Sequence, residues 1–192
     1  MRFHHQNEIP EENDPRNLFE QRILREQRKK SRRRLFTELV ITAVTVFVVF
    51  RVIAGVAVVR GDSMKPNLTN GSLALFYRLN GTYRKNDIVI FRSPGRGEVL
   101  IKRVVAVAGD QVDIDDKTGE LLVNGTVQQE DSIKGKTYTR EGGVQFPLTV
   151  PDGYVFVLGD NREAALDSRN FDAVSVKNLI GKVFFEVKRL AN

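Results

Sequence analysis

Hydrophobic and polar positions change their pattern twice along the 192 residues of the chain. Residues 1–34 are mostly polar, and residues 35–59 form the longest apolar stretch. After residue 60 the chain consists of short runs rich in β-branched and aromatic residues, and turn residues separate these runs. This order predicts a polar tail, one long apolar helix and a mainly β domain.

Seven runs after residue 60 have the length and composition of strands. They are bounded by pairs such as Asn-Gly, Pro-Gly and Asp-Gly, which are typical of turns, and they cover residues 72–78, 87–92, 98–109, 111–115, 120–124, 154–159 and 182–187. A short helix is expected near residues 174–179, and a long loop around residues 130–146. We therefore predict a mainly β domain with long loops over residues 58–192.

The apolar segment, residues 35–57, is expected to cross a membrane. A spanning helix needs about 20 residues, which this segment supplies, although its charge-free centre covers only residues 39–50. Glu38 then lies near the headgroups on one side, and the long side chain of Arg51 extends toward the opposite interface. A buried helix of a soluble protein would be equally apolar, but the β-branched run in this segment suits lipid better than water.

The charge distribution sets the expected orientation. The basic cluster of residues 22–34 lies at only one end of the apolar segment, so the positive-inside rule places residues 1–34 in the cytoplasm and residues 58–192 outside. No convincing small-residue cleavage site follows the segment, which indicates an uncleaved, single-pass signal anchor in the cell membrane. The tail is expected to be disordered or loosely helical in solvent, or else to form a helix on the membrane surface.

The composition excludes several kinds of site. The chain has no cysteine, and its two histidines, His4 and His5, lie in the tail. Thiolate nucleophiles, a Ser–His–Asp triad and a histidine-rich metal site are therefore excluded from the folded domain. Residues 1–34 have a net charge of +4 and the rest of the chain only +2, so a basic groove for nucleic acid is not expected.

Lys102 has an unusual position for a charged residue. In the run from residue 99 to residue 109, strand alternation puts Lys102 on one face with Val104, Ala106 and Ala108. Burial disfavours the charged ammonium and lowers its pKa, and a neutral lysine can act as a general base. Alternatively, the side chain of Lys102 reaches the rim of the strand or pairs with an acidic residue.

Two loops carry further polar candidates. Ser63 lies in a turn between Gly61, which permits unusual backbone geometry, and Pro66, which restricts the chain. Its hydroxyl can face a substrate and its N–H an oxyanion, although most serines in such loops only cap or turn the chain. The second loop, residues 159–169, follows an apolar strand and is either a buried polar network or an exposed loop with local ion pairs.

Four motifs in order, after the N-terminal anchor, resemble the bacterial type I signal peptidases. They are GDSMKP at residues 61–66, DIVIF at 87–91, IKRVVAVAGD at 101–110 and LGDNREAALDSR at 158–169. The resemblance covers about residues 35–188, and the single anchor with a short catalytic region is similar to the Gram-positive type. Enzymes of this family are Ser/Lys membrane proteases with a mainly β catalytic fold, and they remove signal peptides from exported proteins.

The resemblance implies a role for each matching residue. Ser63 would be the nucleophile and Lys102 the general base, with Gly61, Met64 and Pro66 shaping the turn around the oxyanion. A supporting network would comprise Arg103, Asp160, Asn161, Arg162, Asp167, Ser168 and Arg169. No metal or cofactor is implied. The implied partners of a monomeric enzyme are the signal peptides of exported preproteins, the lipid bilayer and the secretion translocon.

Two positions depart from the family pattern. Ala165 stands where many members have a hydroxyl residue that hydrogen-bonds the catalytic lysine, and Gly61 stands where some have an oxyanion-stabilising serine. The N–H of Ser63 is therefore expected to carry more of that stabilisation. The family's preference for small side chains before the cut implies shallow apolar pockets, with Val58 and Val59 among their walls. The alternatives are a catalytically degenerate homologue acting as an assembly or chaperone factor, which Ala165 favours, and a membrane-anchored binding module.

Overall fold

The computed structural model describes residues 15–78, 81–129 and 133–187. The chain divides into two compact units, Met1–Val49 and Phe50–Asn192, and each is described by itself. His4 and His5, with the predictions for the first part of the tail, lie outside the described residues.

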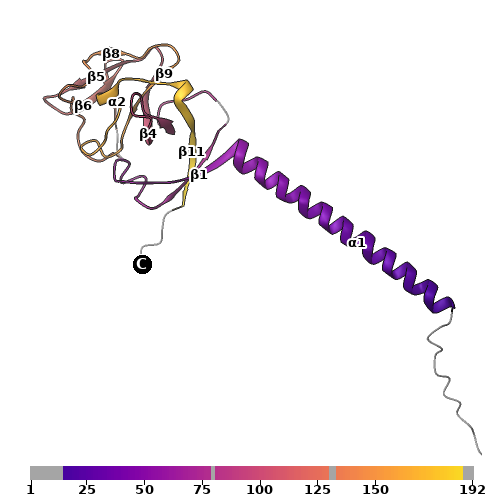
Figure 1. Cartoon of the computed structure of the whole chain (residues 1–192). Helices are drawn as coiled ribbons and strands as arrows, with labels where there is room; N and C mark the ends of the chain where they lie inside the picture. Colours follow the sequence, from indigo (N-terminus) through magenta and orange to yellow (C-terminus); the bar gives the residue numbers. More distant parts are fainter. Residues whose placement is uncertain (1–14, 79–80, 130–132, 188–192) are drawn as a thin grey trace, which may run out of the picture. The chain divides into compact units, whose positions relative to one another are not determined.

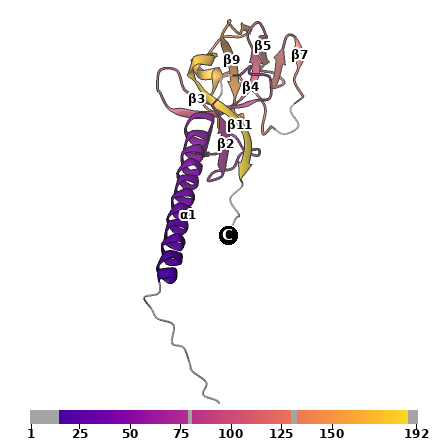
Figure 2. The same ribbon diagram turned by 90° about the vertical axis from the view of Figure 1, so that its right-hand side faces the viewer.

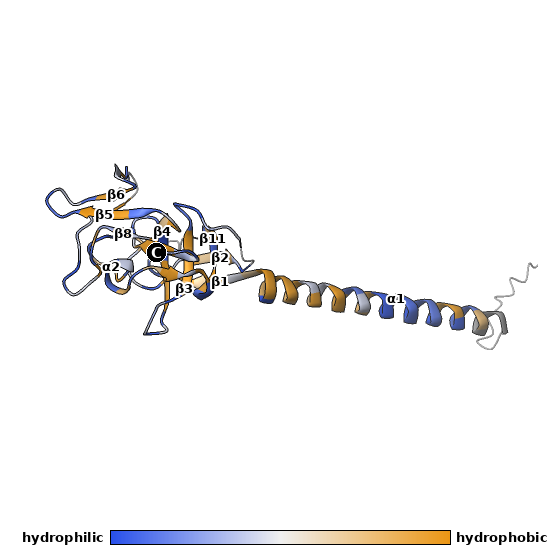
Figure 3. Ribbon diagram, turned by 90° about the horizontal axis from the view of Figure 1, so that it is seen from above, coloured by the Kyte–Doolittle hydropathy of each residue, from blue (hydrophilic) through white to orange (hydrophobic). Residues whose placement is uncertain are grey.

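The first unit consists of helix α1 (Pro15–Val48), and the π-helical segment η1 (Val49–Ile53) follows it in the chain. The N-terminal part of α1 is mainly hydrophilic and its C-terminal part is mainly hydrophobic, as Figure 3 shows. By length and composition, the segment Phe19–Ile53 could cross a membrane, and none of the side chains in its most apolar part is buried. Because α1 begins at Pro15, the described part of the tail, residues 15–34, is helical.

The predicted C-terminal boundary of the apolar helix, residue 57, is wrong. Helical conformation ends at Ile53, and strand β1 (Ala54–Val58) begins at the next residue and pairs with strand β2. Valines favour an extended chain, and Gly55 leaves room for a ring on β2, since a Cβ at Gly55 would lie 2.4 Å from Cζ of Phe76. The β domain therefore starts at residue 54 rather than at residue 58.

A seven-stranded sheet with the order β1-β2-β11-β3-β4-β9-β10 forms one part of the second unit (Figures 1 and 2). Every neighbouring pair in it is antiparallel. Besides β1, its strands are β2 (Leu73–Tyr77), β3 (Ile88–Arg92), β4 (Val99–Val107), β9 (Tyr154–Leu158), β10 (Val174–Ser175) and β11 (Leu179–Val187). Strand β11, which ends the described part of the chain, thus lies beside β2, as Figure 2 also shows.

A smaller sheet of four strands has the order β7-β6-β5-β8. Its strands are β5 (Gln111–Asp115), β6 (Glu120–Val123), β7 (Thr126–Val127) and β8 (Leu148–Thr149). Apolar side chains from the two sheets form a common cluster that includes Ala106, Val112 and Phe156. The domain is mainly β, as predicted, and the described residues between β7 and β8 form no strand, in agreement with the predicted long loop.

The short helix predicted near residues 174–179 is confirmed only in part, because only its middle residues are helical. Residues Val174–Ser175 form β10, a single 3₁₀ turn η2 (Val176–Asn178) follows, and β11 begins at Leu179. Val174 is fully buried and pairs with Val155 of β9, so tertiary packing holds this segment in an extended conformation. Among the described residues of the domain, the α-helix is α2 (Ser168–Phe171).

Strand β4 follows the predicted alternation only in part. Lys102 and Val104 are buried, but Val104 and Ala106 belong to different hydrophobic clusters, and Ala108 is exposed in the turn after the strand. The register between β4 and β9 shifts between Val104 and Ala106, and such a bulge moves the following side chains to the opposite face. The prediction that Ala106 and Ala108 share the face of Lys102 is therefore wrong.

Candidate active site

Ser63 and Lys102 meet although they lie far apart in the chain. Ser63 is in the turn after β1, and Lys102 is in β4. Nζ of Lys102 lies 2.8 Å from Oγ of Ser63, and it donates a hydrogen bond of 3.0 Å to the carbonyl oxygen of Ile101. Strand β9 pairs with β4 only from Arg103 onward, so the edge of β4 around Lys102 is open to the turn that carries Ser63.

The environment of Lys102 favours a neutral amine. Its side chain is 2% exposed, and burial lowers its pKa from 10.5 to about 8, although the negative charges of Asp167 and Asp160 act in the opposite direction. No acidic side chain among the described residues forms an ion pair with Lys102. The alternatives in which Lys102 reaches the strand rim or pairs with an acid are therefore wrong.

The turn that carries Ser63 is held on both sides. Gly61 has a φ of 81°, a conformation that suits glycine, and its N–H donates to Oδ1 of Asn70 at 3.1 Å. Met64 is buried and anchors the turn in the core, whereas Pro66 is exposed. Within the described parts of the chain, the N–H of Ser63 has no hydrogen-bond acceptor, so it is available to a ligand.

Asp160 joins the turn of Ser63 to strand β4. Its carboxylate, which is fully buried, accepts two hydrogen bonds of 2.7 Å from Arg103 and one of 2.8 Å from Nδ2 of Asn67. The N–H of Asn161 donates to the carbonyl oxygen of Ser63 at 3.0 Å. Sequence reasoning missed Asn67, because its partner lies 93 positions away and no local pattern marks the pair.

The loop after β9 is a buried polar network rather than an exposed loop. Asp167 and Arg169 form a bidentate ion pair with two contacts of 2.9 Å. Asp167 also accepts from the N–H of Gly159 at 3.1 Å, and Arg162 donates to the carbonyl oxygen of Gly159 at 3.0 Å. Ser168 accepts from the backbone of β9, so the predicted network residues are brought together beside the dyad.

Gly159 lies in the loop that the sequence marked as polar, but sequence reasoning gave it no role in the site. A Cβ at Gly159 would lie 2.3 Å from Cβ of Ala165 and 2.7 Å from the carbonyl oxygen of Ser63, which is closer than van der Waals contact. Glycine therefore lets the loop approach the nucleophile. Ala165 is buried but offers no hydroxyl, and among the described residues Nζ of Lys102 bonds only to Ser63 and Ile101.

A cleft of about 270 Å³ opens beside Ser63 and Lys102. One wall is formed by the end of β1 and the residues after it, including Val58 and Val59 as predicted, and the other by the start of β4. Among the described residues, no group of His, Asp and Glu side chains is suited to hold a metal ion. A serine hydroxyl beside a buried amine whose pKa is lowered is suited to nucleophilic attack on a carbonyl carbon once the amine has lost its proton.

Comparisons with known proteins show which sequences and structures this chain is similar to. The sequence profile of the family described as "Signal peptidase, peptidase S26" matches residues 32–188. A probable thylakoidal processing peptidase 2 of Arabidopsis thaliana is 41% identical over 157 residues, which cover 75% of this chain and 41% of that protein. Signal peptidase I of Bacillus caldolyticus is 35% identical over 141 residues, which cover 67% of this chain and 76% of that protein.

The matches cover different shares of the relatives' own sequences. The match spans less than half the length of the two thylakoidal processing peptidases of Arabidopsis thaliana, 41% and 45%. A signal peptidase I from Enterococcus faecalis V583, known from a crystal structure, is 31% identical with a TM-score of 0.46, and the similarity covers 55% of this chain and 100% of that one. Since the family profile matches most of its residues, the chain belongs to the signal peptidase family, peptidase S26.

Proposed function

We propose that this chain is a membrane-bound Ser/Lys endopeptidase that removes signal peptides from exported preproteins, with Ser63 as nucleophile and Lys102 as general base. The observation that carries the proposal is the 2.8 Å contact between Oγ of Ser63 and Nζ of the buried Lys102. Membership of the family and the name of the Bacillus relative support it. Two ion pairs near the dyad support its surroundings: the partly buried pair Arg103–Asp160 connects β4 to the loop after β9, and the buried pair Arg169–Asp167 lies within that loop.

Each step of the reaction has a group in this site. The neutral amine of Lys102 accepts the hydroxyl proton of Ser63 while Oγ attacks the scissile carbonyl carbon. The N–H of Ser63 donates to the oxyanion that forms. The ammonium of Lys102 then protonates the leaving amine, and the regenerated amine activates the water that hydrolyses the acyl-enzyme.

The substrate proposed for the cleft is an extended peptide with small side chains before the cut. β1 is an edge strand of the large sheet, and the part of β4 that precedes Arg103 has one unpaired edge. An extended peptide can pair with such edges through main-chain hydrogen bonds. The cleft between them measures about 270 Å³ and is lined mainly by Ala, Val, Leu, Ile and Met, which suits small apolar side chains.

The proposed location is the membrane, with residues 1–34 cytoplasmic, a span from about residue 35 to Ile53, and the β domain from Ala54 outside. Apolar side chains on one face of β1, β2 and β11 support a site close to lipid. They form two rows across the three strands, Val56-Leu75-Phe185 and Val58-Leu73-Val187, and all but Leu75 are exposed. We also propose that the enzyme acts as a monomer and that it receives its substrates from the secretion translocon.

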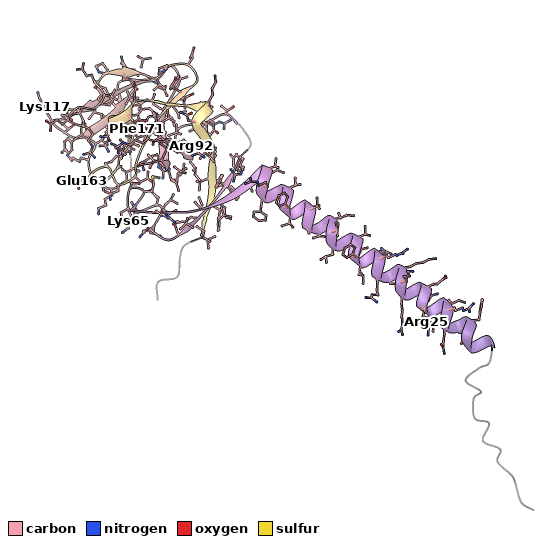
Figure 4. The ribbon with its side chains drawn as sticks, viewed as in Figure 1. Arg25, Lys65, Arg92, Lys117, Glu163 and Phe171 are labelled. Carbon is pink, nitrogen blue, oxygen red and sulfur yellow. The ribbon has the colours of Figure 1, made fainter. Side chains whose placement is uncertain are left out.

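A cleavage assay tests the proposal. The full chain, reconstituted in vesicles, is incubated with a preprotein whose signal peptide has small residues before the cut. Wild type is expected to release the mature protein, whereas Ser63→Ala and Lys102→Ala are expected to lose at least 1,000-fold in kcat/KM, since an activated nucleophile is absent from both. Lys117→Ala is the control, because Lys117 is exposed (Figure 4). Equal cleavage by all four proteins, or by none, would reject the proposal, and the second result would favour a degenerate homologue.

A further inference from the structure

Basic side chains gather on one face of helix α1 immediately before its apolar part. Among the described side chains of residues 19–34, eight are Lys or Arg and only two are acidic. Five of the basic residues each lie three or four positions from another of the five and line a common groove, which we call the basic stripe: Arg25, Arg28, Lys29, Arg32 and Arg33. Residues at such intervals project from the same side of a helix.

Within the described residues, none of the five side chains of the stripe forms an ion pair with an acidic residue. All five side chains are exposed, and the ion pair described on this helix, Arg34–Glu38, lies outside the stripe. Figure 4 shows the side chain of Arg25 projecting from the surface of α1. Five like charges on one face repel each other, and an external anion with several negative groups would relieve this repulsion.

We propose that the basic stripe binds the headgroups of acidic phospholipids, so that α1 collects acidic lipid around the point where it enters the bilayer. This inference rests on the proposed membrane span. Arg33 lies two positions before Leu35, and at about 1.5 Å per residue the part from Lys29 to Leu35 extends about 9 Å along the continuous helix. The headgroup region is about 5–7 Å thick on each side of the hydrocarbon core, so long basic side chains in this part reach it.

The position of the stripe favours a lipid over a polyanion in solution. A basic residue near an acidic membrane surface gains about 1 kcal/mol of attraction, and this gain falls off within a Debye length. Basic residues that only set the orientation of a helix in the membrane can lie on any side of that helix. The residues of the stripe instead line one groove on α1. Phe36 lies on the same side at the end of the groove and marks the depth at which the apolar part begins.

The test uses tryptophan fluorescence, because the chain has no Trp of its own. The full chain with Phe36→Trp is reconstituted in phosphatidylcholine vesicles that contain a minor fraction of either brominated phosphatidylglycerol or brominated phosphatidylcholine. Bromine quenches tryptophan at close range, so the ratio of the two quenching curves gives the local enrichment of acidic lipid. We expect an enrichment of at least about threefold at low salt that decreases as salt is added.

A pair of matched variants tests whether the basic stripe itself, rather than the total positive charge of the helix, attracts the acidic lipid. Lys29→Gln/Arg33→Gln removes one Lys and one Arg from the stripe, and Lys30→Gln/Arg34→Gln removes the same charges one position further along, on another side of the helix. Gln preserves helix propensity, so both variants keep the helix. The proposal predicts that the first variant loses at least half of the enrichment and the second keeps it.

Each other outcome has a distinct meaning. An equal loss in both variants would overturn the stripe as the binding face. Quenching without any preference for the acidic lipid would overturn the proposal and favour a soluble polyanion, such as an acidic protein, as the partner. No quenching by either brominated lipid would show that Phe36 is outside the bilayer, which would reject the proposed span and the inference together.

Discussion

Replacing Lys102 by methionine should abolish catalysis and at the same time stabilise the fold at neutral pH. Met has a similar length and no charge, so it fills the same space between the turn of Ser63 and β4. The wild-type domain must bury an amine that is mostly protonated at pH 7, since the pKa of Lys102 in the folded state is about 8. Burial of the charged ammonium lowers the free energy of unfolding of wild type, and the uncharged Met side chain of the variant has no such cost.

The magnitude follows from the pKa. A decrease from 10.5 to about 8 corresponds to roughly 3 kcal/mol at about 1.4 kcal/mol per pH unit. Because the folded-state pKa is depressed, the unfolded chain binds more protons between pH 8 and pH 10.5, and the stability of wild type rises with pH over this range. Loss of the hydrogen bonds to Ser63 and Ile101 offsets the gain by about 1–2 kcal/mol. At pH 7 we therefore expect Lys102→Met to be about 1–2 kcal/mol more stable.

Chemical unfolding of the full chain in detergent, followed by circular dichroism between pH 7 and pH 10.5, measures this effect. The difference between wild type and variant cancels the titration of all other groups. Wild type should gain roughly 3 kcal/mol relative to Lys102→Met over this range, so the variant becomes the less stable protein at the upper end. A difference that stays constant with pH would refute the depressed pKa of Lys102.

Three further substitutions test the surroundings of the dyad. Ala165→Ser should keep or raise kcat/KM, by up to about tenfold, because the new hydroxyl can bond Nζ of Lys102; a large loss in the preprotein assay would show a different arrangement. Asn67→Leu removes the hydrogen bond to Asp160 and should lower kcat about tenfold with the pH midpoint unchanged, and an unaltered kcat would show that Asn67 does not position the turn. Gly159→Ala should reduce kcat at least about 100-fold, because its Cβ would displace the backbone at Ser63, and wild-type kcat would contradict the close approach.

The features that the sequence predicted correctly are those encoded by local patterns. Runs such as residues 87–92 and 111–115 combine β-branched residues with clear turn signals, and both are strands. Lys102 stood out because a cation in an apolar strand conflicts with its neighbours, and it is buried beside Ser63. The resemblance to a known family, which rests on four motifs including GDSMKP at residues 61–66, paired Lys102 with Ser63.

The errors occurred where tertiary contacts decide the local structure. Valines suit both a helix in lipid and a β-strand, so the pattern around Val56 could not show that the helix ends at Ile53. Strands of two residues, such as Val174–Ser175, exist only through pairing with a neighbour and leave no periodic signal. The bulge after Val104 depends on its partner strand β9 in the same way. The hydrogen bond from Asn67 to Asp160 joins residues 93 positions apart, and only the folded chain brings them together.

The titration of Lys102 is the most direct measurement, since catalysis as proposed requires this side chain to lose its proton near neutral pH. NMR of the full chain with 13C-labelled lysine, assigned by comparison with Lys102→Arg, follows its Cε signal while kcat/KM is measured over the same pH range. Both curves should have a midpoint at about pH 8, with kcat/KM falling about tenfold per pH unit below it. A Cε midpoint near 10.5, or a kcat/KM that does not change around pH 8, would contradict a neutral Lys102 as the base.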